Sequence, residues 1–432
     1  MYFLLHTVAF LFLTTYAFRL MISKPSYVKL SKKEKVLLTG REKFLLFTLV
    51  TGMFQVGSFS SLRLMLWMVM MMAAFILYRR SPSFNRLNII YILFLIWLLI
   101  TTAWAPSSEY ALRVFLKYFY PLITLLFAAT FVHTKEFIFV AVKWMLISAF
   151  LYSIFLGGVM THILGIWVFY MGGMFWPMST LNDYLSIMSA VSFVMWWRTK
   201  EKKYLFLIVW FLLTSLLQSV RTGILSTGMM LMVASYLRYK LVALPYWIVG
   251  VAIGIATILF VPQVKEKMFY NPDSVMTVSD IIQAQNENNL NTNMRAYMWE
   301  HLLHTFYEGK EWVGSGLGSI QHYMYENFVF GGLKAVHGDY VQMQCDVGDI
   351  GLLLYLLFPL SIYLYTRKYV HKRPLDPLQV SAVLAVLSYA AVLPAMGFDN
   401  IVNYSFASHS YPFIFTGIFL AYKRQIRAQR RR

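Results

Sequence analysis

Hydrophobic and polar positions divide the chain into long apolar runs separated by short polar connectors. The runs are almost free of charged residues, and most have about the length, roughly 20 residues, that an α-helix needs to cross a bilayer. They lie at about 2–18, 44–58, 64–78, 88–104, 114–131, 136–156, 180–197, 204–219, 222–237, 244–261, 348–366, 376–396 and 410–422. A transmembrane β-barrel would instead alternate apolar and polar residues. We therefore predict an all-α, polytopic bundle of about 12–13 transmembrane helices.

Composition supports this class and excludes others. Hydrophobic residues make up 59% of the chain and charged residues only 13%, so an ordinary soluble globule is excluded. The formal net charge of +19 is high. In a membrane protein, however, basic residues report topology first, so we predict no nucleic-acid partner. The single cysteine, Cys345, allows no intrachain disulfide.

The basic residues predict how the chain is oriented in the membrane. Of the 38 Lys and Arg residues, 29 lie in six alternate connectors and the C-terminal tail. The positive-inside rule places these on the cytoplasmic side. We expect ten helices over 1–261, an extracytoplasmic loop at 262–347, and C-terminal helices with a basic cytoplasmic tail at 348–432, all forming one functional unit.

The loop is the only long polar segment of the chain, and it carries more acidic than basic residues. Its stretch Asn271–Asn293 is rich in asparagine and is expected to be irregular. Ala296–Tyr307 has apolar residues at helical spacing, which predicts a short helix lying against the membrane. The loop glycines at 314, 316 and 318 lack the strand and the Lys-Ser/Thr of a phosphate-binding loop, so they predict a tight turn.

Two arginines are candidates for binding an anion. Arg221 follows Ser219 between two apolar runs. A guanidinium at such a depth usually faces a protein interior or a polar cavity, and its planar fork suits phosphate oxygens. The alternative is an interfacial anchor that extends to water. Arg295 opens the loop helix with Trp299 one turn later, so the pair could position an anion or anchor the helix in the headgroup region.

Further polar residues lie where the helices meet the predicted outer surface. Arg113 and Lys117, four residues apart on one helical face, could extend a phosphate site, but their position favours interfacial anchoring. Asn182, and likewise Asp399 with its neighbours before the last helix, suit sugar hydroxyls, but asparagine at such a position also caps helices.

His337 stands at the end of the loop, just before Asp339 and the next helix. Imidazole exchanges protons near neutral pH, so His337 is a candidate general base, while a structural role is the alternative. His301 and His304 have the spacing of two metal ligands. Without the general-base glutamate of H-E-x-x-H beside them, we predict no metal site.

Taken in order, these motifs resemble the O-antigen ligase and O-antigen polymerase superfamily over about residues 180–400. The resemblance rests on S-x-R-[ST] at 219–222, R-x3-W at 295–299, the G-x-G-x-G turn, and a histidine followed by G-x2-G-L at 348–352. The upstream helices are similar only in number and spacing. One position departs from the family: the histidine is commonly followed by asparagine, and here Gly338 stands in that place.

The resemblance implies a metal-independent, inverting glycosyltransferase of GT-C-like type, with no cofactor, in the inner (cytoplasmic) membrane. Such enzymes transfer a glycan from undecaprenyl diphosphate to a hydroxyl acceptor on the outer face. Arg221 and Arg295 would stabilise the charge of the diphosphate, and His337 would act as base. Arg113, Lys117, Asn182, Ser219, Trp299 and Asp339 would bind substrate.

The reaction most favoured is polymerisation of surface polysaccharide repeat units. Ligation of the glycan to lipid A core is the alternative within the family. Lipid-linked oligosaccharide transport is an alternative of another class, but it predicts internal repeats and charges at helix midpoints that the sequence lacks. Expected partners are the lipid-linked glycan donor, a glycan or lipid-linked acceptor, the bilayer, and polysaccharide-export or chain-length proteins.

Overall fold

A computed structural model describes residues 2–31, 33–54, 57–156, 178–218, 220–286, 289–327, 329–330 and 333–431. Thirteen of its helices lie outside the polar segment 262–338. They are α1 (Tyr2–Ile22), α2 (Gly40–Thr51), α3 (Ser60–Leu77), α4 (Arg86–Thr101), α5 (Ser108–Phe131), α6 (Phe137–Leu156), α9 (Met178–Thr199), α10 (Lys202–Leu217), α11 (Arg221–Tyr239), α12 (Leu244–Phe260), α17 (Asp339–Val370), α18 (Pro377–Met396) and α19 (Ser410–Arg430).

These helices confirm the predicted fold class, since each predicted apolar run overlaps one of them. Within the described residues, eight helical segments are long and apolar enough to cross a membrane. One of these segments, Arg221–Phe260, joins α11 to α12 through the short 3-10 turn Lys240–Ala243. The run predicted at 44–58 is shorter than expected, because α2 ends at Thr51. The chain is thus an all-α, multi-pass membrane protein.

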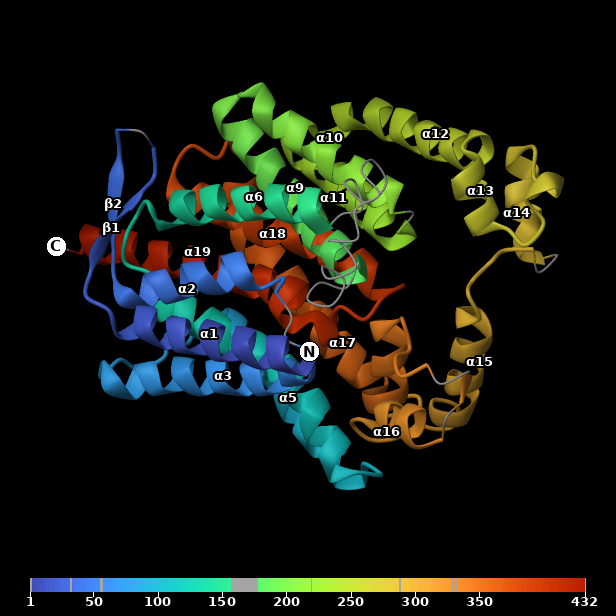
Figure 1. Cartoon of the computed structure of the whole chain (residues 1–432), viewed down its shortest axis with the longest axis horizontal. Helices are drawn as coiled ribbons and strands as arrows, with labels where there is room; N and C mark the ends of the chain where they lie inside the picture. Colours follow the sequence, from blue (N-terminus) through green and yellow to red (C-terminus); the bar gives the residue numbers. More distant parts are fainter. Residues whose placement is uncertain are drawn as a thin grey trace.

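A small hairpin was not predicted. Strands β1 (Ser26–Lys29) and β2 (Lys35–Leu38) pair antiparallel in the basic connector between α1 and α2. In Figure 1 the hairpin and the C-terminus lie at one end of the bundle. The basic connector therefore forms a β-hairpin, which its lysine-rich sequence did not indicate.

The core of the bundle forms around α5, α9, α18 and α19, whose apolar side chains are largely buried. The longest shared interface joins α5 to α19. By contrast, α12 buries none of its residues and lies at the edge of the bundle (Figure 1). An apolar helix with no protein around it is suited to contact with lipid.

The polar segment 262–338 contains α13 (Pro262–Met268), α14 (Val278–Asn286), α15 (Arg295–Phe306) and α16 (Ser319–Glu326). Helix α15 confirms the helix predicted at 296–307. The expectation of an irregular stretch at 271–293 was wrong, because α14 lies within it. Phe269, Val275 and Ala284 form a small core there, which pays part of the cost of ordering so polar a stretch.

A second small core holds α15 and α16 against the start of α17. Met298, Leu302, Ile320, Met324, Val336 and Cys345 are its buried members. Figure 1 shows α15 and α16 at the end of the bundle opposite the β-hairpin. Trp97 and Trp104 donate indole hydrogen bonds to the Val347 and Gly314 carbonyls, at 2.9 and 3.2 Å, which attaches this part to the C-terminal end of α4 and the short turn after it.

Helix α17 is kinked at Gly348, which has φ +68° and ψ −176°. A Cβ at this position would lie 2.3 Å from the Trp312 backbone, so only glycine fits. The kink separates the first two turns, which belong to the core of the polar segment, from the long apolar part of the helix. The predicted tight turn at 314–318 is also confirmed, since its three glycines have positive φ.

Candidate active site

Arg221 is the first residue of α11, where it extends toward the polar segment. Its Nη1 donates a hydrogen bond of 2.7 Å to the carbonyl of Asn291. Two residues later, Gly223 packs against α9 so tightly that a Cβ there would lie 2.8 Å from the Cβ of Asn182. The contact between α9 and α11 therefore determines where Arg221 stands.

Asn182, predicted to bind sugar, is fully buried and donates to the side chain of Gln218. Its neighbour Asp183 is buried too, and no described residue forms a hydrogen bond with either of its carboxylate oxygens. Ser186, one turn further along α9, contacts the Gly223 carbonyl and the Thr227 hydroxyl. This polar network joins α9 to α11 beneath Arg221. Ser219, also predicted to bind substrate, lies outside the described residues.

Arg295, the first residue of α15, reaches the short turn that follows α18. Its Nη1 donates to the Phe398 carbonyl at 2.5 Å. Arg221 and Arg295 are close enough for their charges to repel each other. Burial is the main cause that lowers the pKa of Lys267, and the positive charge of Arg221 lowers it further. Three positive side chains from α11, α13 and α15 thus gather in one region, and such an arrangement attracts an anion.

Trp299 lies one turn after Arg295 and holds the loop that leads into α17. Its Nε1 donates to the Val336 carbonyl at 2.9 Å. Its ring covers Gly338, where a Cβ would come within 3.1 Å of the indole. The asparagine that the family commonly has after its histidine would thus displace this ring. The ring also lies near that of Phe398, with 6.4 Å between the centroids.

His337 adopts a left-handed backbone conformation, with φ +51°. Its backbone N–H donates to Asn400 Oδ1 at 2.9 Å. A non-glycine residue in this region is strained and persists only where its surroundings hold it. Here Trp299 holds the preceding residue and Asn400 holds His337 itself. The His337 side chain is 27% exposed, so solvent or a substrate can reach the imidazole.

Two side chains compete for the imidazole Nδ1. Asp399 Oδ1 lies 3.3 Å from it, and Asn400 Nδ2 lies 3.1 Å from it. The buried carboxylate favours a proton on Nδ1, because an ionic acceptor binds a donor more strongly than an amide does. Within the described residues Nε2 has no hydrogen-bond partner, so this tautomer leaves it able to accept a proton.

The turn that carries Asp399 and Asn400 is itself held by predicted site residues. Asp339 Oδ2 accepts from the Val402 backbone at 3.1 Å, and Lys117 Nζ donates to Asn403 Oδ1 at 2.6 Å. Arg113 instead forms an ion pair with Glu109 four residues earlier. Lys117 and Asp339 therefore contact the turn behind His337, and Arg113 does not.

Asp399 and Asn400 were expected to contact sugar, and their contact with His337 was missed. They lie 62 and 63 residues after the histidine, and no sequence spacing announces the pairing. The two histidines with metal-ligand spacing have separate hydrogen-bond partners in the structure. His301 contacts the Tyr323 hydroxyl at 3.0 Å, while His304 contacts Glu308 at 2.6 Å.

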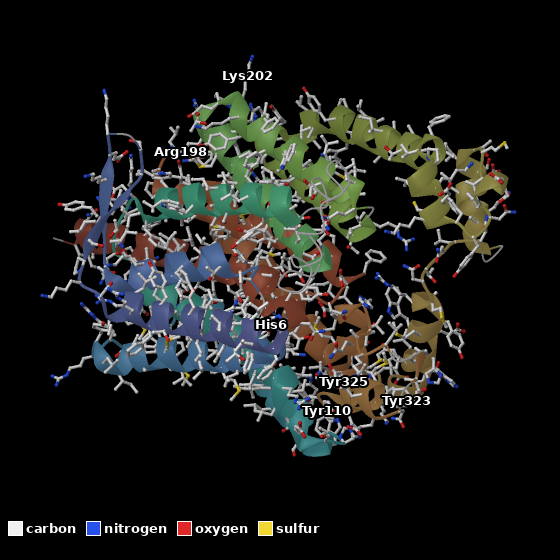
Figure 2. The ribbon with its side chains drawn as sticks, viewed as in Figure 1. His6, Tyr110, Arg198, Lys202, Tyr323 and Tyr325 are labelled. Carbon is white, nitrogen blue, oxygen red and sulfur yellow. The ribbon has the colours of Figure 1, made fainter. Side chains whose placement is uncertain are left out.

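Helix α16 completes the wall around this region. Tyr325 of α16 lies near Tyr110 of α5, with 5.7 Å between the ring centroids (Figure 2). The Tyr110 hydroxyl donates to Glu326 at 2.9 Å, which holds α16 on the bundle. At the other end of α16, the carboxylate of Asp346 in α17 accepts a hydrogen bond of 3.0 Å from the backbone N–H of Ile320.

Comparison with known proteins found one matching family model. Residues 206–356 match the family model described as O-antigen ligase. This segment includes Arg221, Arg295 and His337, and it ends before Asp399. A search of curated proteins found no match. The match supports the predicted resemblance: residues 206–356 are similar to the O-antigen ligase family, within the part of the chain whose motifs resemble the O-antigen ligase and polymerase superfamily.

Proposed function

We propose that the protein transfers an undecaprenyl-diphosphate-linked glycan to a hydroxyl acceptor on the extracytoplasmic face of the membrane, and that it thereby polymerises polysaccharide repeat units. The observation that carries this proposal is the contact chain between three residues distant in sequence. Arg221 interacts electrostatically with Arg295, Arg295 binds the Phe398 carbonyl, and the next residue, Asp399, contacts His337.

The cationic side of the site suits the donor. As the bond between the sugar C1 and the phosphate oxygen breaks, negative charge develops on the diphosphate. Arg221 and Arg295 can each present two N–H donors to phosphate oxygens, which lysine cannot do with the same geometry. Charge stabilisation by guanidinium groups supplies what a divalent cation would otherwise contribute.

The imidazole side suits the acceptor. A hydroxyl that attacks C1 forms a new C–O bond and must lose its proton, and His337 Nε2 accepts that proton. The positive charge on the imidazolium is then stabilised by Asp399. Attack opposite the departing diphosphate inverts the configuration at C1.

The test uses the purified full-length protein in proteoliposomes with a lipid-linked repeat-unit donor. Longer glycans on the lipid carrier support polymerisation, provided that Arg221→Ala and His337→Ala abolish them. Transfer to added lipid A core, without longer carrier-linked products, identifies a ligase instead. Movement of the donor across the bilayer without any transfer would replace the enzymatic proposal by transport.

A further inference from the structure

A cavity of about 860 Å³ opens at the end of the bundle that carries the β-hairpin, far from the arginines and His337. It lies between α6, α9, α10 and the hairpin turn. Its wall on α6 includes Phe139, Leu146 and Phe150, one apolar face that extends for roughly 16 Å at the helical rise of 1.5 Å per residue. This length suits a hydrocarbon chain lying parallel to the helix.

The charged residues of the cavity all lie at its hairpin end. They are at the start of α6, the end of α9, the start of α10 and the hairpin turn, namely Glu34, Glu136, Lys143, Arg198, Glu201 and Lys203. The far end is lined by Ile147, Leu151 and Phe206. The cavity thus changes from polar to apolar along its length, as a membrane lipid does.

Some of these charged groups already bind other residues of the protein, and others remain available to a ligand. Glu201 and Lys203 pair with each other. Arg198, labelled in Figure 2, donates through Nε to the Leu375 carbonyl at 3.2 Å, and no described residue bonds its two Nη groups. Among the described residues, neither Glu34 nor Glu136 forms an ion pair with a cation. Lys143 Nζ donates to the Lys29 carbonyl at 2.9 Å and is not neutralised by an acid among the described residues. Two cations and two carboxylates are therefore available to a ligand.

We propose that this cavity binds a zwitterionic phospholipid with a primary ammonium, of the phosphatidylethanolamine type. The phosphate lies at the Nη groups of Arg198, with Lys143 nearby. The ammonium donates hydrogen bonds to Glu34 and Glu136, and one acyl chain lies along α6. The cavity volume falls within the range of roughly 300–1,000 Å³ usual for ligand sites.

The balance of charge decides between lipid classes. A purely anionic headgroup would satisfy Arg198 but would repel both carboxylates. A choline headgroup has a positive charge but no N–H to donate to them. Only a headgroup with a phosphate and a primary ammonium satisfies both signs. A lipid bound there would join α6 to α9, whose opposite end carries the network beneath Arg221.

The test measures lipid binding to the delipidated, detergent-solubilised full-length protein by native mass spectrometry. The probes are palmitoyl-oleoyl phosphatidylethanolamine, phosphatidylglycerol and phosphatidylcholine. Phosphatidylethanolamine should bind most tightly. Glu34→Gln combined with Glu136→Gln should weaken it about two- to fivefold, the range expected for partly exposed ion pairs, and should remove its advantage over the other two lipids.

A second pair of variants tests the position of the acyl chain. Ile147→Trp fills the apolar end of the cavity and should abolish phosphatidylethanolamine binding. Ile253→Trp, on α12 and 62% exposed, is the matched control and should bind like the wild type. Tighter binding of phosphatidylglycerol, or equal binding by the two tryptophan variants, would overturn the proposal. These readouts are independent of glycan transfer, so they stand or fall separately from the proposed function.

Discussion

Within the part of the chain that the structure describes, Arg221 uses one of its guanidinium nitrogens to bind the protein. Nη1 binds the Asn291 carbonyl, and among the described residues no carboxylate pairs with the side chain. Arg295 is likewise bound to a carbonyl and not to an acid. Two neighbouring cations without an acidic partner repel each other, and this repulsion is relieved when an anion binds between them.

We predict that Arg221→Lys loses almost as much transfer activity as Arg221→Ala. Lysine keeps the charge but lacks the planar fork that binds two phosphate oxygens. Glycan transfer in proteoliposomes measures the effect. Arg113→Lys is the control, because Arg113 pairs with Glu109 and should tolerate the change. Full activity of Arg221→Lys would show that this residue is only an interfacial anchor.

His337→Ala should reduce the transfer rate by about 10²–10⁴, the usual contribution of a general base. Donor binding should persist, because the arginines remain. Single-turnover transfer and donor binding, measured on the same preparation, separate the two effects. A folded variant with normal transfer would remove His337 from the mechanism.

Asp399→Asn should lower the maximal rate while leaving donor affinity unchanged. The amide can no longer stabilise the imidazolium, and it no longer selects the tautomer with Nδ1 protonated. Because the rate then depends on an imidazole without its carboxylate, the pH at half-maximal rate should also shift downward. An unchanged pH profile with a lower melting temperature would indicate that Asp399 serves only the fold.

At the scale of elements, the bend in α17 places the loop of His337 over the bundle. The part of α17 before Gly348 packs with α15 and α16, and the part after it packs with α4 and α18. A straight helix could not pack against both of these groups of helices. The positive φ of one glycine therefore positions the whole polar segment.

Gly348→Ala should destabilise the protein strongly. The extended, positive-φ conformation of Gly348 (φ +68°, ψ −176°) costs a non-glycine residue about 1–3 kcal/mol, and the new Cβ would collide with the Trp312 backbone. Thermal unfolding in detergent measures the effect. Gly254→Ala on α12 is the control, since no atom lies within 4 Å of its Cβ position and alanine favours a helix. Equal melting temperatures for both variants would mean that the kink is not constrained.

At the scale of the whole molecule, the two ends of the bundle differ in charge. The end with the β-hairpin and the C-terminus carries most of the basic residues, and the polar segment lies at the other end (Figure 1). From the positive-inside rule we propose that the polar segment, and the candidate site with it, faces away from the cytoplasm.

Cysteine labelling of intact cells tests this orientation. Met276→Cys, in the polar segment and 74% exposed, should react with a membrane-impermeant maleimide. Leu241→Cys, in the turn after α11 and 82% exposed, should react only after permeabilisation. The native Cys345 is buried and should give no background. The reverse pattern would place the site in the cytoplasm and exclude an outer-face reaction.

The sequence by itself determined the class of fold and the approximate bounds of most of the described helices, and it pointed to the arginines and histidine of the candidate site. These features depend on local physics, because the length and polarity of each run decide whether it can enter a bilayer. The R-x3-W motif lies in the predicted helix α15, and the three glycines form the predicted tight turn. Both features also depend on the local sequence.

Only the tertiary structure decided which of these residues meet. Asp399 and Asn400 contact His337 across more than 60 residues of chain, and Asn182 became part of the packing between α9 and α11. The helix α14 and the β-hairpin were also hidden, because polar residues mask the few apolar contacts that hold them. Such pairings depend on how helices pack against one another, and a one-dimensional pattern of polarity carries no information about partners distant in the chain.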